Sequence, residues 1–86
     1  MFEVVLTHEA LRTYRKADAV LARKLNRCFD VIARNPFSHP NIKRLSGLLR
    51  GRFRYRIGDW RVVYRVDENS AKVIVLVIAH RSDVYR

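Results

Sequence analysis

The sequence predicts an α+β fold, in which a small antiparallel or mixed sheet carries an N-terminal helical hairpin on one face. Two observations predict it. Apolar residues recur at helical spacing up to residue 34, whereas from residue 52 onward they alternate with arginine at the period of a strand. A chain of 86 residues has room for one core, so we expect one domain spanning residues 1–86 in the order β-α-α-β-β-β.

The N-terminal elements follow from caps and apolar spacing. Residues 2–6 are short and β-branched, which predicts a strand. Thr7 and Asp18 each offer a side-chain oxygen to cap a helix, the first over residues 8–16 and the second after Asp18. The second helix should end before Pro36, because the residue before proline avoids the helical region. Its predicted apolar stripe comprises Leu21, Leu25, Cys28, Phe29 and Ile32.

Three strands are expected in the C-terminal half, with no clear element between residues 35 and 51. Gly58 and Asp59 form a two-residue turn signal, and a second polar turn spans residues 67–70. The continuous apolar run over residues 73–79 predicts a strand covered on both faces. The expected strands are residues 52–57, 60–66 and 72–81.

The two-residue turn fixes which side chains share a face of the sheet. It places Arg56 opposite Arg61, and by the same register Arg54 faces Val63 and Arg52 faces Arg65; directly opposed residues share a face. We expect Arg81 to join them if the second turn has an even number of residues. The alternate residues should face the helices: Phe53, Tyr55, Ile57, Trp60, Val62, Tyr64 and Val66.

This concentration of arginine points to an anionic ligand. Like charges directly opposed on a sheet cost a few tenths to about 1 kcal/mol per pair, so folding alone does not favour them. Guanidinium groups bind phosphate through two parallel hydrogen bonds. The formal net charge of +10 also favours nucleic acid or an acidic protein as partner. The alternative is a solvated face whose arginines are spaced only by strand alternation.

Other features narrow the class of protein. Cys28 is the single cysteine, and the N-terminus has neither a signal peptide nor a membrane span, so we expect a cytoplasmic protein without a membrane partner. His8 and His39 are isolated, and no ligand spacing indicates a metal or another cofactor. We expect Cys28 and Trp60 to be core residues.

Two C-terminal motifs carry a family resemblance. Residues 54–64 read RYRIGDWRVVY and residues 79–85 read AHRSDVY, and together they resemble the paired motifs of RelE/ParE toxins. The earlier Leu45-Ser46-Gly47 resembles the family's Leu-x-Gly. The resemblance covers nearly the whole chain and implies a RelE-like fold. The basic residues together with a near-terminal tyrosine favour the RelE branch.

The resemblance to RelE implies a metal-independent endoribonuclease that cleaves messenger RNA in the ribosomal A site and so inhibits translation. In that chemistry the substrate's 2′-hydroxyl attacks the adjacent phosphate and leaves a 2′,3′-cyclic phosphate. Arg56 and Arg61 would stabilise the phosphorane, Arg81 the leaving 5′-oxygen, and Tyr85 would stack on a base and orient the 2′-hydroxyl. The implied catalytic set is Arg54, Arg56, Arg61, Arg81 and Tyr85.

One departure bears on the mechanism. RelE carries lysines at the positions of Arg54 and Arg56, and an arginine cannot lose its proton as a general base must. Histidine is the side-chain type whose reference pKa suits a general base, which makes His80 a candidate near the motif, although on a regular strand it points away from Arg81 and a hydrogen-bonding role is the alternative. Further RNA-binding candidates are Lys43, Arg44, Arg52 and Arg65.

Two other functions stay open. A ParE-like toxin would inhibit DNA gyrase without cleaving RNA, and a non-catalytic module would only bind RNA. For the RelE reading the expected partners are messenger RNA, the ribosome and a cognate antitoxin whose acidic or amphipathic segment wraps the toxin; no small-molecule cofactor is expected.

Overall fold

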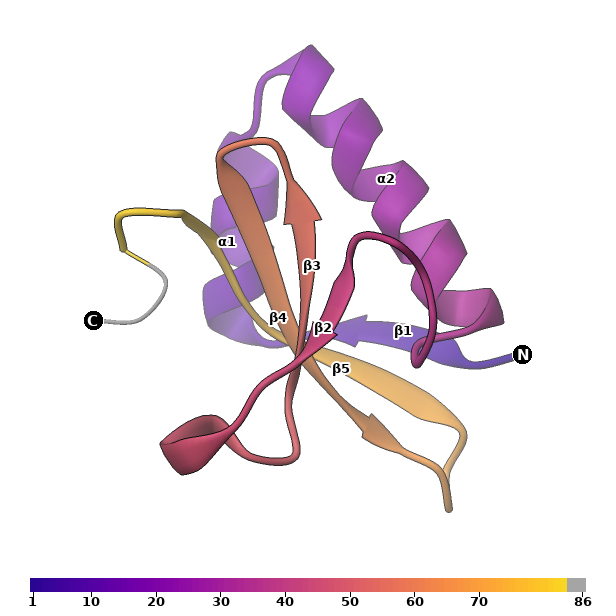
Figure 1. Cartoon of the computed structure of the whole chain (residues 1–86). Coiled ribbons are helices and arrows are strands. Elements are labelled where there is room, and N and C mark those ends of the chain that lie inside the picture. The colour runs from indigo at the N-terminus through magenta and orange to yellow at the C-terminus, as the bar shows by residue number, and fades with distance from the viewer. Residues whose placement is uncertain (84–86) are drawn as a thin grey trace.

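The computed structural model of the protein describes residues 1–83 and has one mixed sheet with two helices (Figure 1). The strand order in the sheet is β1-β5-β4-β3-β2; β1 runs parallel to β5, and every other neighbouring pair is antiparallel. In chain order the elements are β1 (Glu3–Leu6), α1 (His8–Lys16), α2 (Ala19–Arg34), β2 (Ile42–Arg44), the short 3₁₀ helix η1 (Gly47–Leu49), β3 (Phe53–Ile57), β4 (Trp60–Asp67) and β5 (Lys72–His80).

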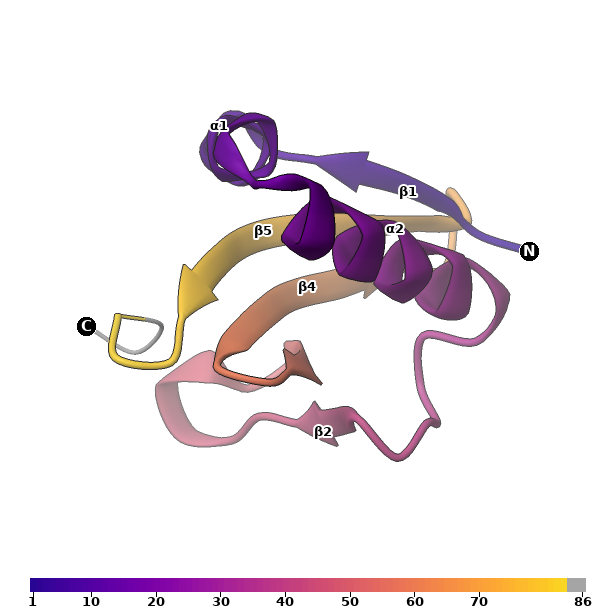
Figure 2. The same cartoon turned by 90° about the horizontal axis from the view of Figure 1, so that it is seen from above.

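The two helices begin at the predicted caps. The Thr7 hydroxyl accepts from the backbone N–H of Ala10 at 3.2 Å, and the Asp18 carboxylate accepts from that of Leu21 at 2.8 Å. α2 ends at Arg34, before Pro36 as predicted. The helices run in opposite directions but splay apart, and both lie on one face of the sheet (Figure 2).

The core lies between the helices and the sheet. It includes the predicted helix stripe and the predicted inward residues of the hairpin, and Cys28 is among them as expected. Trp60 packs partly buried against this core. The Tyr64 hydroxyl is buried and donates to the Pro36 carbonyl at 2.7 Å, which attaches the loop after α2 to the middle of the sheet. The buried cluster consists of Ala10, Leu25, Cys28, Ile32, Phe53, Tyr55, Ile57, Val62, Tyr64, Val73, Val75 and Ile78.

Three expectations need correction. A short strand, β2, lies in the segment for which the sequence predicted no element, because it pairs with β3 at the edge of the sheet. The β3–β4 ladder ends at Phe53 and Tyr64, so Arg52 and Arg65 are not a ladder pair. The strand over residues 73–79 is buried only on its helix-facing side; Ile74 and Val77 on the other side are partly exposed. The helices of residues 1–83 are too short and too polar to cross a membrane.

Candidate functional site

The β3–β4 hairpin has the register that its turn predicted. Ile57 pairs with Trp60 across the two-residue turn, Arg56 pairs with Arg61, and Arg54 pairs with Val63. Gly58 has a φ of 55°, in the left-handed region that glycine tolerates and that such turns demand. The arginines of the two strands therefore lie on the outer face, the side of the sheet away from the helices.

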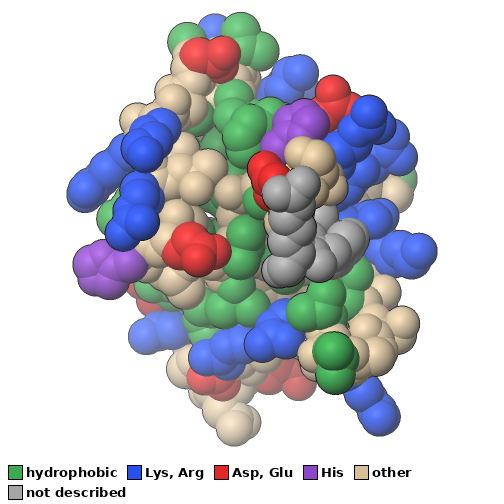
Figure 3. Space-filling view, turned by 90° about the vertical axis from the view of Figure 1, so that its left-hand side faces the viewer, with side chains coloured by type: hydrophobic (Ala, Val, Ile, Leu, Met, Phe, Trp, Pro, Cys, Tyr) green, Lys and Arg blue, Asp and Glu red, His purple; other side chains and the backbone are tan. Residues whose placement is uncertain are grey.

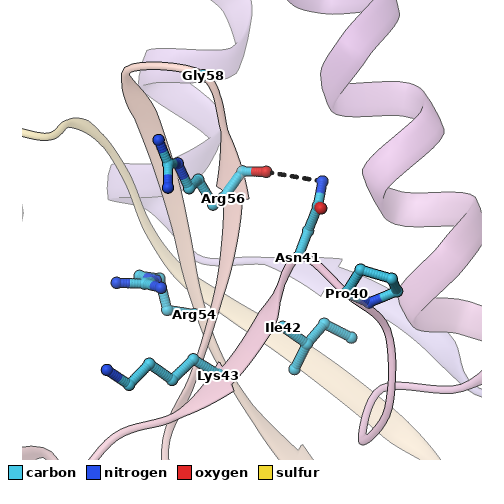
Figure 4. Close-up of a pocket in the computed structure, with 7 residues that line it drawn as sticks. All are labelled: Pro40, Asn41, Ile42, Lys43, Arg54, Arg56 and Gly58. Atoms are coloured by element: carbon cyan, nitrogen blue, oxygen red, sulfur yellow. Dashed lines mark hydrogen bonds between the residues drawn. The ribbon is translucent and has the colours of Figure 1, made fainter.

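β2 extends this basic surface by one strand. Lys43 pairs with Arg54, which places both side chains on the outer face. We call Lys43, Arg54, Arg56 and Arg61 the basic cluster. A cavity of about 590 Å³ is lined by Lys43, Arg54 and Arg56, and in Figure 4 these three side chains project to the same side. Pro40, Asn41, Ile42 and Gly58 complete its lining.

Asn41 fixes the backbone of Arg56 beyond the end of the β2–β3 ladder. Its side-chain amide donates to the Arg56 carbonyl at 3.1 Å (Figure 4). The backbone carbonyl of Asn41 accepts from the Arg56 N–H at 3.0 Å. His39 supports this loop, since its Nδ1 accepts from the Asn41 N–H at 3.0 Å and its ring stacks on Tyr55. The sequence analysis missed Asn41. No pattern around it in the sequence, between Pro40 and Ile42, marks it as a site residue.

Arg54 combines a covered stem with an unsatisfied donor. Its Nε is buried and has no hydrogen-bond partner among residues 1–83. Its cross-strand neighbour Val63 is only 5% exposed although it lies outside the helix-side core. We infer that arginine stems cover this valine while their guanidinium groups face solvent. A buried donor without a partner costs about 1–3 kcal/mol, which an anionic ligand would recover.

Two further arginines meet the turn between β3 and β4. The Nη1 of Arg61 donates to the Gly58 carbonyl at 2.8 Å and to the Trp60 carbonyl at 3.0 Å. The Nε of Arg81 lies 3.8 Å from the Asp59 carboxylate, and the Arg81 N–H donates to the Asp59 carbonyl at 2.6 Å. The β3–β4 turn therefore contacts both Arg61 and Arg81.

A β-bulge brings Arg81 to this side of the sheet. The second turn has four residues between the paired Asp67 and Lys72, which is an even number. The prediction that an even turn by itself would put Arg81 on the arginine face was nevertheless wrong. With an even turn and a regular ladder, Arg81 would alternate onto the helix side. The irregularity at Val63 and Tyr64 shifts the register by one residue, so that Arg61 pairs with Ala79, the residue two before Arg81.

The remaining predicted residues lie apart from the basic cluster. Arg44 pairs with Phe53 and its guanidinium lies 5.2 Å from that ring's centroid, which is the opposite side from Lys43. His80 pairs with Trp60 and packs edge-on against its ring, so it does not face the arginines. Arg65 lies on the outer face as predicted, where it pairs with Ile74 beyond the end of the β3–β4 ladder. Arg52 lies just before the start of β3, and Tyr85 lies outside the described residues.

The outer face is half basic and half apolar. Residues 31–58 contain no Asp or Glu but seven Lys and Arg, which concentrates positive charge on β2 and β3. Toward β1 the same face carries Ile74 and Val77, together with Val5, which is 37% exposed. Figure 3 shows hydrophobic side chains in the middle of one side of the molecule, with Lys and Arg side chains on both sides of them. Such a face attracts a polyanion to one half and leaves apolar contacts to the other.

The core groups near the sheet stay neutral. Burial raises the pKa of the Cys28 thiol and that of the Tyr64 hydroxyl well above their usual values, so neither group ionises at neutral pH. Burial likewise raises the pKa of Tyr55. Within residues 1–83, no three His, Cys, Asp or Glu side chains are grouped as metal ligands would be.

Comparison with known proteins places this geometry among toxins. Residues 4–85 match the family model described as the ParE toxin of the type II toxin-antitoxin system parDE. Toxin RelG of Mycobacterium tuberculosis is 34% identical over 78% of this chain and 75% of its own length, and Toxin RelE of that organism is 33% identical over 99% and 87%. A chain of the M. tuberculosis toxin-antitoxin complex RelBE2 has a TM-score of 0.78 and 31% identity, over 93% of this chain and 98% of that one.

Proposed function

Because the chain belongs to the family of ParE toxins of type II toxin-antitoxin systems, we propose that this toxin acts as a RelE-like endoribonuclease that cleaves messenger RNA in the ribosomal A site. Cleavage there would stop translation. The RelE branch is favoured because two curated relatives at 33% identity or more are Toxin RelG and Toxin RelE.

The observation that carries the proposal is the basic cluster. Lys43, Arg54 and Arg56 line one cavity, and Arg61 pairs with Arg56 across the hairpin. The buried Nε of Arg54 is a donor for which residues 1–83 supply no acceptor. Folding does not favour opposed arginines, and a phosphate would supply negative charge to the cluster and an acceptor for the Arg54 Nε.

The chemistry follows from where charge develops during cleavage. The substrate's 2′-oxygen attacks phosphorus, the bond to the 5′-oxygen breaks, and the two products carry a 2′,3′-cyclic phosphate and a 5′-hydroxyl. Arg56 and Arg61 would stabilise the phosphorane's added charge, and Arg81 would stabilise the leaving 5′-oxygen. By family resemblance Tyr85 would stack on a base and orient the 2′-hydroxyl.

Electrostatics and orientation would supply most of the rate. The guanidinium groups at positions 54 and 56 keep their protons, so neither Arg54 nor Arg56 serves as the general base. His80 packs against Trp60 on the helix side, which argues against it as the base. Preorganised donors that match the transition state are worth about 100-fold to 1,000-fold each in comparable sites.

Primer extension on a defined messenger RNA tests the proposal. Purified toxin is added to programmed 70S ribosomes and, separately, to the naked RNA. We expect new 3′ ends only in the ribosomal sample, and we expect Arg81→Ala to remove nearly all of them, leaving a slow residual cleavage that single-turnover assays can measure. Tight RNA binding without any cut strand would favour a non-catalytic module instead.

Inhibition of DNA gyrase is the second candidate, because the matching family model is described as a ParE toxin. Such a toxin would not need the basic cluster for its activity. Supercoiling assays with purified gyrase distinguish the two: inhibited supercoiling, with translation unaffected, would replace the ribonuclease proposal.

A cognate antitoxin is the expected protein partner, as the similar RelBE2 structure is a toxin-antitoxin complex. The net charge of +10 and the half-apolar outer face suit an acidic, amphipathic segment. We expect toxin and antitoxin to elute together in gel filtration. A toxin that stays a free monomer beside its neighbouring gene's product would contradict this.

A further inference from the structure

Asp59 lies where the β3–β4 turn meets the end of β5, beside one of the proposed catalytic arginines. Its carboxylate is 3.8 Å from the Nε of Arg81, and its carbonyl accepts the Arg81 N–H at 2.6 Å. We propose that Asp59 is a positioning residue that holds the Arg81 guanidinium in place for cleavage. The inference rests on the ribonuclease function proposed above.

Arg81 needs such a support because the sheet ladder no longer fixes it. The last ladder pair of β4 and β5 is Trp60 with His80, and Arg81 is the next residue along the chain. Its side chain is 67% exposed. A long exposed side chain samples many rotamers, and a catalytic cation that is misplaced by about 1 Å can cost about 100-fold in rate. The backbone hydrogen bond from Asp59 holds the Arg81 main chain, and the nearby carboxylate attracts the guanidinium toward the turn.

The same turn also contacts Arg61, a member of the basic cluster. Arg61 donates to the carbonyls of Gly58 and Trp60, the residues on either side of Asp59. Three consecutive residues of the turn therefore hold the two arginines: Gly58 and Trp60 contact Arg61, and Asp59 contacts Arg81. This arrangement sets the position of Arg81 relative to Arg61, which is what a reaction that needs charge at both the phosphorane and the leaving oxygen requires.

Two simpler roles for Asp59 predict different outcomes. An ion pair this exposed contributes little to stability, so a purely structural role predicts no change in chemistry. A carboxylate near a phosphate site also repels RNA. If repulsion were its only effect, its removal would tighten binding and leave the cleavage rate equal or faster. Positioning predicts the opposite sign for the rate.

The test measures single-turnover cleavage of messenger RNA on programmed ribosomes over a range of toxin concentrations. Asp59→Asn removes the charge and keeps the backbone contact. We expect the maximal rate to fall about tenfold while the half-saturating concentration stays equal or decreases, as a misplaced catalytic group predicts. Asp59→Glu should recover most of the rate. The matched control is Glu68→Gln, which removes one negative charge in the turn at the other end of β4 and should leave both parameters unchanged.

A double-mutant cycle with Arg81→Ala decides whether Asp59 acts through Arg81. In that background Asp59→Asn should change the residual rate by less than about twofold, because coupled residues are non-additive. Equal thermal unfolding midpoints of all variants show that each one folds. The same loss in both backgrounds, or a rate that Asp59→Asn leaves unchanged or raises, overturns this inference alone. No cleavage by the unmodified toxin overturns the proposed function, and this inference with it.

Discussion

The two faces of the sheet are built from the same strands and have opposite consequences for the free energy of folding. Toward the helices, Tyr55, Val62 and Val75 are 5% exposed or less and belong to one core. On the outer face, Arg56 opposes Arg61, and the Arg54 Nε lacks a partner among residues 1–83. Strand alternation separates the apolar residues that stabilise the fold from the arginines that we propose to bind RNA.

The outer face therefore lowers the folding stability of the unbound toxin. Burial of a large apolar side chain contributes about 1.5–3 kcal/mol, whereas a pair of opposed like charges costs up to about 1 kcal/mol. A bound anion would offset this repulsion between the arginines. A toxin of this kind is therefore expected to be most stable with an acidic partner or RNA on its outer face.

The largest expected effect is on stability and comes from the helix-facing side. Ile32 on α2 is fully buried in the core. Ile32→Ala should lower the free energy of unfolding by about 2–5 kcal/mol, since it removes apolar contacts and leaves a cavity. Urea unfolding followed by fluorescence checks this. A loss below about 1 kcal/mol would show that the core repacks around the smaller side chain.

A substitution on the outer face should have the opposite effect: it should change activity and leave the stability of the fold nearly unchanged. Arg61→Ala is expected to lower ribosome-dependent cleavage about 100-fold, the effect of losing one preorganised donor. Stability should change by less than about 1 kcal/mol, because lost hydrogen bonds are offset by relief of the Arg56 repulsion. Arg15→Ala on exposed α1 removes the same charge and serves as control. Equal losses in both variants would indicate general electrostatic attraction instead.

Replacing Arg54 should keep or raise folding stability and lower RNA affinity together. Arg54→Met keeps much of the stem that covers Val63 and removes the unsatisfied Nε, so the variant should be equally stable or up to about 1 kcal/mol more stable. RNA binding should weaken about tenfold, which corresponds to about 1.4 kcal/mol. Thermal unfolding and RNA titration measure the two quantities. A clear drop in stability would show that the guanidinium supports the fold.

The smallest effect concerns Asp67, at the end of β4 next to the β4–β5 turn. Hydrogen bonds from the Ser70 side chain and backbone lower its pKa in the folded protein. A lowered pKa stabilises the fold above the unfolded value of about 4, and the contribution is lost as the pH falls through the folded-state pKa. Asp67→Asn should therefore lose slightly less stability than the unmodified toxin between pH 5 and about pH 2. Identical acid profiles would contradict this.

The sequence predicted the parts of the fold that depend on neighbours along the chain. The caps at Thr7 and Asp18, the end of α2 before Pro36 and the register of the β3–β4 hairpin each follow from local rules of backbone geometry. It did not predict β2, because three residues carry too little pattern and form a strand only by pairing with β3. It also missed Asn41, whose partner is 15 residues away.

The sequence by itself determined that arginines would share one face, because alternation and a two-residue turn leave no other register. It also determined the family, through motifs carried by the chain. Only the tertiary structure decided which basic residues lie together in the proposed site. A hydrogen bond to the β3–β4 turn placed Arg81 beside Asp59, pairing with β2 added Lys43, and Arg44 went to the opposite side. These contacts join segments distant along the chain, so packing rather than local preference fixes them.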